Sequence, residues 1–255
     1  MTLLPGAEPF HHEGGPVGAL LCHGFTGTPQ SLRPWAEHLA EHGLTVSLPL
    51  LPGHGTRWQD MQITRWEDWY AAVDHELRAL TARCDRVFVC GLSMGGSLAL
   101  HLAAVHGAAV SGLVLVNPSV RSDSAAAVLL PVLRHVVTSI PGVANDIAKE
   151  GSTELAYDRT PLHAAWSLSR LWRTVQTELP QVTQPLLLFR SPDDHVVSPA
   201  NAQLLLSRIS STDVEERLCG RSFHVATLDH DAETIFEGSL DFIRRLVPAT
   251  RADPA

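Results

Sequence analysis

The stretch Gly91-Leu92-Ser93-Met94-Gly95-Gly96 decides the fold, because it joins an apolar strand to a helix. The residues from Arg86 to Ser93, RVFVCGLS, read as a buried strand, and those from Met94 to Gly107 read as a helix. A Gly-x-Ser-x-Gly in this context is typical of a tight turn that lifts a serine above the sheet, at the positive end of the helix. The pattern predicts Ser93 as a nucleophile. The alternative is a glycine-rich turn that contains an incidental serine.

On both sides of this turn, short apolar runs alternate with longer amphipathic ones. Alternation at this spacing predicts an α/β fold with a mostly parallel central sheet and helices on both faces. The expected strands are Val17–Gly24, Leu44–Leu51, Arg86–Ser93, Gly112–Pro118, Pro185–Ser191 and Asp213–Gly220. The expected helices are Ser31–Gly43, Trp66–Cys84, Met94–Gly107, Pro199–Ile209 and Asp231–Val247.

The alternation is interrupted between Ser119 and Gln181, where we expect helical or irregular chain and no strand. This predicts a core made of residues 1–118 and 182–255, with residues 119–181 inserted as a small lid over the sheet. The insertion contains an apolar stretch from Ala125 to Val137. That stretch either packs on neighbouring helices, or lines an apolar pocket or meets a lipid surface.

A nucleophilic serine needs a general base and a carboxylate that orients the base. In a strand-turn-helix site of this kind the acid and then the histidine follow the serine along the chain. Asp193 and Asp194 both lie on the loop after the expected strand Pro185–Ser191. Asp194 is favoured as the acid because it precedes the apolar pair Val196-Val197 and the helix start at Pro199, whereas Asp193 is nearer the strand. Asp193 is then a turn-stabilising aspartate.

Three histidines follow the acid: His195, His224 and His230. His195 is too close to Asp194 in the sequence to face it well, and His230 lies where the last helix begins. His224 follows the final expected strand, so its loop can bring an imidazole between Ser93 and Asp194. We therefore predict His224 as the base.

A tetrahedral intermediate needs two N–H donors aimed at its oxyanion. The backbone N–H of Met94, directly after the serine, is one candidate, and that of Phe25, in the loop His23-Gly24-Phe25, is the other. His23 precedes the serine in the chain, which favours a bracing role for its side chain over a catalytic one. His54 is interpreted in the same way.

Composition disfavours several other classes of function. The chain has 19 Lys and Arg against 27 Asp and Glu, with no basic run, so we expect no nucleic-acid partner. The four cysteines form no CxxC pair and His11-His12-Glu13 is an isolated polar cluster, so we expect no metal site and no cofactor. The cysteines are interpreted as small buried hydrophobes in a reducing compartment. The first fifteen residues lack a basic and then apolar leader, so a cytoplasmic location without stable membrane insertion is expected.

Taken together, the motifs resemble the bacterial carboxylesterases and monoacylglycerol lipases of the α/β-hydrolase fold. The matching stretches, in order, are GAEPF at Gly6, GPVGALLCHGFTGTPQSLRP at Gly15, LPGHGT at Leu51, GLSMGG at Gly91, ELAYDRTP at Glu154, DDHVVSP at Asp193 and HVATLD at His224. The likeness covers nearly the whole chain. It is strongest to the thermostable monoacylglycerol lipase branch, in which a methionine follows the serine.

This resemblance implies Ser93, Asp194 and His224 as the catalytic triad and Phe25 and Met94 as the oxyanion donors. It also implies that Glu154, in the insertion, binds the glycerol head of a monoacylglycerol. The expected reaction is hydrolysis of monoacylglycerols to a fatty acid and glycerol through an acyl-serine intermediate, with transient contact between the lid and a lipid surface. The alternatives are a short- or medium-chain carboxylesterase, a thioesterase and, from another class, a non-catalytic binding protein on the same fold.

Overall fold

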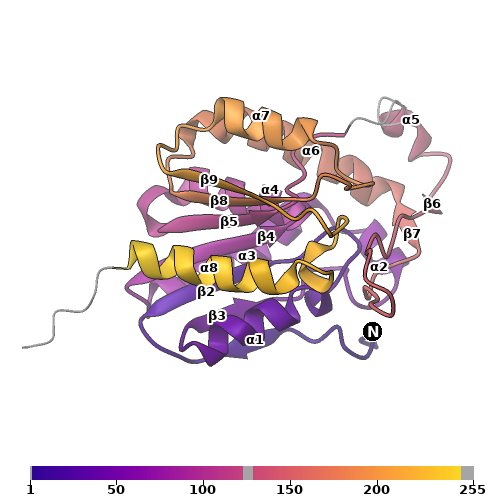
Figure 1. The fold of residues 1–255 in the computed structure, drawn as a ribbon. Helices are drawn as coiled ribbons and strands as arrows, with labels where there is room; N and C mark the ends of the chain where they lie inside the picture. Colours follow the sequence, from indigo (N-terminus) through magenta and orange to yellow (C-terminus); the bar gives the residue numbers. More distant parts are fainter. Residues whose placement is uncertain (1, 123–128, 248–255) are drawn as a thin grey trace, which may run out of the picture.

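The computed structural model describes residues 2–122 and 129–247 and is built around one seven-stranded sheet (Figure 1). The strand order is β1-β3-β2-β4-β5-β8-β9. Neighbouring strands are parallel except β1 and β3, which are antiparallel. The mostly parallel sheet predicted from the alternation is therefore confirmed. The strands are β1 (Phe10–His12), β2 (Val17–Cys22), β3 (Thr45–Leu48), β4 (Arg86–Leu92), β5 (Gly112–Val116), β8 (Leu186–Arg190) and β9 (Val214–Leu218).

Helices cover both faces of the sheet. Helices α1 (Arg33–Glu41) and α8 (Ala232–Leu246) lie together on one face, and α3 (Trp66–Thr81), α4 (Met94–His106), α6 (Leu162–Glu178) and α7 (Ala200–Arg208) pack on the other (Figure 1). Strand β5 shows how the core is divided into two clusters, one on each face of the sheet, because its side chains alternate between the two faces. Leu113 and Leu115 join the cluster under α3 and α4, whereas Val114 and Val116 join the cluster under α1 and α8.

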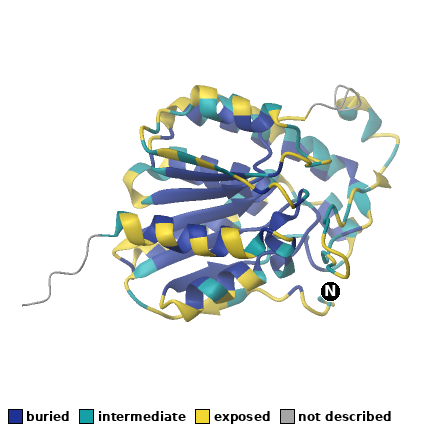
Figure 2. Cartoon of the chain, viewed as in Figure 1, coloured by how far each residue is buried: buried dark blue, intermediate teal, exposed yellow. Residues whose placement is uncertain are grey.

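The central strands are buried on both faces, as Figure 2 shows by their dark colour. Every residue of β5 and all but the first residue of β4 are buried. This is why these strands read as continuous apolar runs in the sequence, without a polar alternation. The four cysteines are also buried and none forms a disulfide, as expected for small hydrophobes.

The structure differs from the sequence expectations at four short elements. β1 and the five-residue helix α2 (Trp58–Gln62) were not expected, and the insertion contains an antiparallel strand pair although no strand was expected there. The paired strands are β6 (Ser139–Pro141) and β7 (Arg159–Pro161). Three residues cannot display a hydrophobic period, and both segments end in proline, which disfavours a strand prediction.

The insertion predicted between residues 119 and 181 leaves the sheet after β5 and returns at β8. Its described elements are α5 (Leu130–Leu133), β6, β7 and α6. Helix α6 buries Leu168, Leu171 and Val175 in the same hydrophobic cluster as α4 and the sheet. Of the apolar stretch from Ala125 to Val137, residues 125–128 lie outside the described residues.

Within the two described ranges, no helix combines the length and the apolar character needed to cross a bilayer.

Candidate active site

Ser93 occupies a strained turn between β4 and α4. Its φ of 56° and ψ of −117° are unusual for a residue with a side chain. The backbone N–H of Ser93 donates to the Val116 carbonyl at 3.1 Å, and its own carbonyl accepts from the Ser119 N–H at 3.1 Å. These bonds to the end of β5 and the chain beyond it hold the turn in place.

Two glycines make this turn sterically accessible. A Cβ on Gly95 would overlap the carbonyl of Cys22, and a Cβ on Gly91 would overlap the carbonyl of Gly95. Helix α4 can therefore approach β2 closely only because Gly95 has no side chain, and it can pack against the end of β4 only because Gly91 has none. Close packing of backbone on backbone thus explains why glycine occupies positions 91 and 95 of the motif.

Asp194 and His224 meet at the end of the sheet where Ser93 lies. The Nδ1 of His224 and the Oδ2 of Asp194 are 2.7 Å apart, and their side chains are only 9% and 2% exposed. The other carboxylate oxygen of Asp194 accepts the N–H groups of Val196 and Val197, at 2.8 and 2.7 Å. One oxygen is thus bound to its own loop while the other holds the imidazole. Nε2 remains as the nitrogen that can exchange a proton with a serine.

The other acid and base candidates take different positions. Asp193 is exposed beside Asp194. His195 is 60% exposed, and its Nδ1 contacts Asp146 Oδ1 at 2.7 Å. His230 lies in the turn before α8, where its N–H donates to Asp229. The arrangement brings His224, and not His195 or His230, onto the carboxylate of Asp194.

Ser93, Asp194 and His224 line one cavity of about 550 Å³. Phe25 lines it too, and its ring packs edge-on against Trp69 at 5.8 Å. Met94 is the first residue of α4, and its side chain is buried. The N–H groups of a first helical turn have no acceptor within the helix, so the Met94 N–H is free to bind an anion. The role of both residues as oxyanion donors stays a prediction.

Glu154 lines the same cavity. A Cβ on Gly27 would come within 2.9 Å of its Oε1, so the absence of a side chain at Gly27 makes room for the carboxylate. Burial raises the pKa of Glu154, and the nearby His224 partly offsets this by favouring the charged form. Apolar residues of the insertion line the same cavity, among them Leu130, Leu133, Leu162, Leu168 and Trp172.

Three side chains that the sequence analysis did not single out hold the histidine loop. Asn117 Nδ2 donates to the His224 carbonyl at 2.8 Å, and Asp146 Oδ2 accepts the His224 N–H at 3.1 Å. Asp229 Oδ2 accepts the N–H of Phe223 at 2.9 Å. Asp229 belongs to the HVATLD motif and Asn117 directly follows β5, so the position of each in the sequence gave a weak indication that it lies near the site. Nothing in the sequence around Asp146 gave such an indication.

His23 and His54 are buried next to each other, with ring centroids 5.0 Å apart. His23 donates from Nδ1 to the Gly24 carbonyl at 3.0 Å and accepts the Leu51 N–H on Nε2 at 3.2 Å, which requires the neutral tautomer. Burial, with help from His54, lowers the pKa of His23 to about 3. Burial also lowers the pKa of His54 to about 4. His23 thus connects the loop of Phe25 to the chain after β3, as expected for a brace.

These two histidines predict a loss of stability in acid. Their pKa values are lowered from 6.5, so below that pH the unfolded chain binds protons that the native state excludes. The stability they contribute is complete above pH 6.5 and falls as the pH falls toward 4 and 3. Each should add about 1.4 kcal/mol per pH unit to the slope of the unfolding free energy between about pH 6 and 5.

Urea unfolding at a series of pH values measures this slope. His54→Gln is expected to reduce the slope by about 1.4 kcal/mol per pH unit, whatever its effect on stability at pH 7. The matched control is His12→Gln, because His12 is exposed on β1. Equal slopes for the wild type and His54→Gln would mean that His54 is not a buried neutral histidine.

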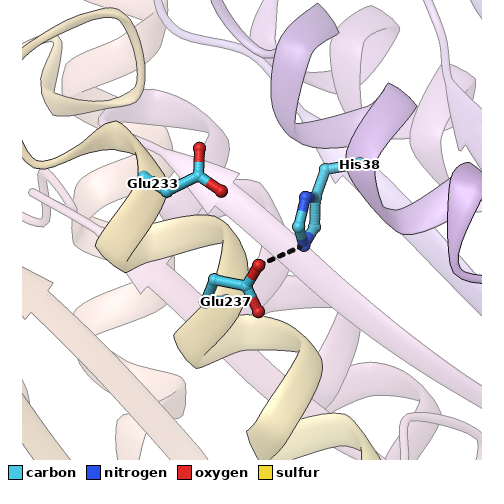
Figure 3. A group of neighbouring side chains, drawn as sticks. All are labelled: His38, Glu233 and Glu237. Atoms are coloured by element: carbon cyan, nitrogen blue, oxygen red, sulfur yellow. Dashed lines mark ion pairs between the residues drawn. The ribbon is translucent and has the colours of Figure 1, made fainter.

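A separate cluster lies between α1 and α8 (Figure 3). His38 faces Glu233 and Glu237, and the three ligand atoms lie within 4.8 Å of one another. His38 Nε2 and Glu237 Oε1 are 3.8 Å apart, which is an ion pair when the histidine is protonated. Among the described residues this is the group that could hold a metal ion, although both carboxylates are exposed. The sequence analysis missed it because α1 and α8 meet only in the folded chain.

The chain is similar to known proteins in both sequence and structure. Residues 18–231 match the model of the family described as serine aminopeptidase, S33. The chain is 43% identical to the thermostable monoacylglycerol lipase of Bacillus sp. (strain H-257), over 95% of this chain and 96% of that protein. It is 25% identical to a carboxylesterase of Bacillus subtilis (strain 168), over 94% and 97% of the two chains.

Among solved structures, one from work on the metagenome-derived lipolytic enzymes LipS and LipT superposes with a TM-score of 0.93. That structure is 41% identical to this chain and covers 96% of it, while this chain covers all of that one. The match extends over both parts of the sheet and over the insertion between them. The chain therefore belongs to the serine aminopeptidase, S33, family of serine hydrolases and has the α/β-hydrolase fold.

Proposed function

We propose that this protein hydrolyses monoacylglycerols to a fatty acid and glycerol through an acyl-serine intermediate. The observation that carries the proposal is one cavity that is lined by Ser93, the hydrogen-bonded pair Asp194 and His224, the half-buried carboxylate of Glu154, and apolar side chains of the insertion. A monoacylglycerol has matching parts: an ester, a head with two hydroxyls and an apolar chain. The similarity to the Bacillus lipase supports the same substrate class.

The chemistry proceeds in two halves. Ser93 Oγ attacks the ester carbonyl carbon while its proton passes to Nε2 of His224, and the oxyanion accepts the N–H groups of Phe25 and Met94. The ester C–O bond then breaks, and His224 returns the proton to the departing glycerol oxygen. Water attacks the acyl-serine in the same way, with His224 as base, and releases the fatty acid. Asp194 keeps the imidazole in the required tautomer and stabilises its protonated form.

Glu154 is proposed to select the glycerol head. Its carboxylate can accept hydrogen bonds from the two free hydroxyls, and such bonds are strong where water is excluded. The alternative role is that of an ordinary lid glutamate with no part in substrate binding. A simple carboxylesterase would need the same triad but no polar group at this position, so Glu154 separates the two candidate functions.

The test is the selectivity of Glu154→Ala. We expect kcat/KM for monoacylglycerols to fall by about 1–3 kcal/mol, or about 5- to 150-fold, because the head hydroxyls lose their partner. Hydrolysis of p-nitrophenyl butyrate should stay within about twofold, since its leaving group offers no hydroxyl. The measurement is the ratio of the two kcat/KM values at a series of pH values, because the raised pKa of Glu154 means that higher pH favours its ionised form.

Glu150→Ala is the matched control, because it removes an exposed glutamate from the same insertion. It should leave the ratio unchanged. A ratio that does not move in Glu154→Ala would favour the carboxylesterase alternative. A wild-type protein that a fluorophosphonate does not label would instead favour a non-catalytic binding protein.

The insertion also supports the expected contact with a lipid surface. Large apolar side chains stand exposed on it, among them Leu129, Val132, Val136 and Val143, at 64%, 70%, 80% and 68%. Leu130 and Leu133, which are next to these residues in the chain, line the cavity, and exposed apolar groups are typical of a surface that meets an interface. We therefore propose that these exposed apolar side chains of the insertion contact a lipid surface transiently. We also propose that the protein is located in the cytoplasm.

A further inference from the structure

Asp146 lies in the insertion between β6 and β7, where residues 145–149 cross the loops of the proposed acid and base. We call this segment the strap. Asp146 Oδ2 accepts two backbone N–H groups, those of His195 and His224, each at 3.1 Å. The backbone carbonyl of Asp146 accepts the N–H of Val225 at 3.1 Å. Its side chain is 11% exposed, so these bonds are largely shielded from water.

The two amides that share this oxygen belong to different loops. His195 follows Asp194 directly on the loop after β8, and His224 is on the loop after β9. The sheet pairing between β8 and β9 ends at Arg190 and Leu218, so it does not extend to either loop. A single carboxylate oxygen therefore joins the backbone of the acid's loop to that of the histidine, next to where Asp194 and His224 must meet at 2.7 Å.

The strap is itself anchored on both sides of Asp146. The N–H groups of Ala148 and Lys149 donate to the buried carboxylate of Asp229, at 2.7 and 2.9 Å. On the other side, Asn145 Oδ1 accepts the N–H of Glu154 at 2.6 Å. These bonds hold Asp146 in place, so that its carboxylate can fix the position of the loops after β8 and β9. The same strap is bonded to the residue that we propose to bind the glycerol head.

We propose that Asp146 is a positioning residue for the Asp194–His224 pair, through hydrogen bonds to the backbones of both loops. The inference rests on the proposed triad. It assigns to the insertion a part in the acid–base step, in addition to covering the cavity. The other oxygen of Asp146, Oδ1, contacts only the exposed imidazole of His195 among the contacts described. Because the bonds that join the two loops are to backbone N–H groups, the proposed role requires an acceptor oxygen at the position of Oδ2 rather than a negative charge.

The test compares Asp146→Ala with Asp146→Asn. Asp146→Ala is expected to lower kcat by about 10- to 100-fold with little change in KM, the scale of a slightly misplaced catalytic group. Its rate of labelling by a fluorophosphonate should fall in parallel, because labelling needs the activated serine but not the glycerol head. Asp146→Asn keeps an acceptor oxygen and should retain kcat within about threefold of the wild type.

Proton NMR supplies a readout that a merely stabilising residue would not move. The wild type should give a downfield resonance for the imidazole N–H held between His224 and Asp194. Asp146→Ala should broaden or lose this signal, while Glu150→Ala, an exposed glutamate just beyond the strap, should keep it along with the wild-type kcat. All rates are measured well below the melting temperature of each variant.

Three results would overturn the inference. They are a wild-type kcat in Asp146→Ala with only a lower Tm, a change confined to KM, and an Asp146→Asn variant as impaired as Asp146→Ala. Failure of the proposed function has a different signature. In that case the wild type itself resists the fluorophosphonate, or Ser93→Ala remains active, whatever the Asp146 variants do.

Discussion

Ser93→Ala is expected to lower kcat by about 10⁴- to 10⁶-fold, the scale for removing the nucleophile of a catalytic triad. No other group in the proposed mechanism can form the acyl intermediate, so the remaining rate reflects substrate binding and the oxyanion donors alone. The melting temperature should change little. Alanine keeps the Cβ and the same backbone strain at φ 56°, and the bonds that Ser93 makes to Val116 and Ser119 are made by its backbone.

Steady-state rates with a monoacylglycerol and with p-nitrophenyl butyrate measure the effect, on protein free of wild-type enzyme. Ser207→Ala is a suitable control, because the Ser207 hydroxyl bonds only to the Leu204 carbonyl in helix α7 among the contacts described. It should leave kcat unchanged. Activity of Ser93→Ala within about 100-fold of the wild type, together with continued fluorophosphonate labelling, would show that another residue is the nucleophile.

Asp194→Asn is expected to lower kcat by about 10⁴-fold, while Asp193→Asn should stay within about twofold of the wild type. The amide oxygen of an asparagine can still accept the N–H groups of Val196 and Val197, so the loop is kept. Its NH₂ group would then face Nδ1 of His224 and demand the opposite tautomer. Nε2 would carry the proton and could not accept one from Ser93.

The paired variants make this a sharp comparison, since both replace one aspartate by asparagine on the same loop. Thermal unfolding checks that each variant is folded, and kcat with either ester gives the result. Comparable losses in Asp193→Asn and Asp194→Asn would mean that the 2.7 Å contact between Asp194 and His224 is not what orients the base.

Much of the fold and the candidate triad could be read from the chain because the decisive signals are local. Ser93 lies between a strand and a helix that are contiguous with it, and the glycines around it report a turn that needs no distant information. The longer strands were predicted because buried central strands are continuous apolar runs. By contrast, β1, β6 and β7 have three residues each and leave no such pattern.

The choice among three histidines shows where sequence reasoning depended on topology. His224 was preferred because its loop follows the last strand, but nothing in the local sequence gives its distance from Asp194. Asp146 had no signal at all, because an aspartate in an irregular stretch resembles any polar loop residue. The His38, Glu233 and Glu237 cluster was invisible for the same reason, since it joins the two ends of the chain across α1 and α8.

The sequence by itself determined the α/β class and the order of the long strands and helices, and it singled out Ser93, Asp194 and His224 as the candidate triad. These follow from side-chain periodicity and turn chemistry, which act over a few neighbouring residues. Only the tertiary structure decided which loops meet, and therefore that Asp146 and Asn117 hold the backbone of His224 and that Glu154 shares the cavity of Ser93. Such contacts depend on how strands distant in the chain pair and how the insertion packs back on the sheet, and no local pattern records them.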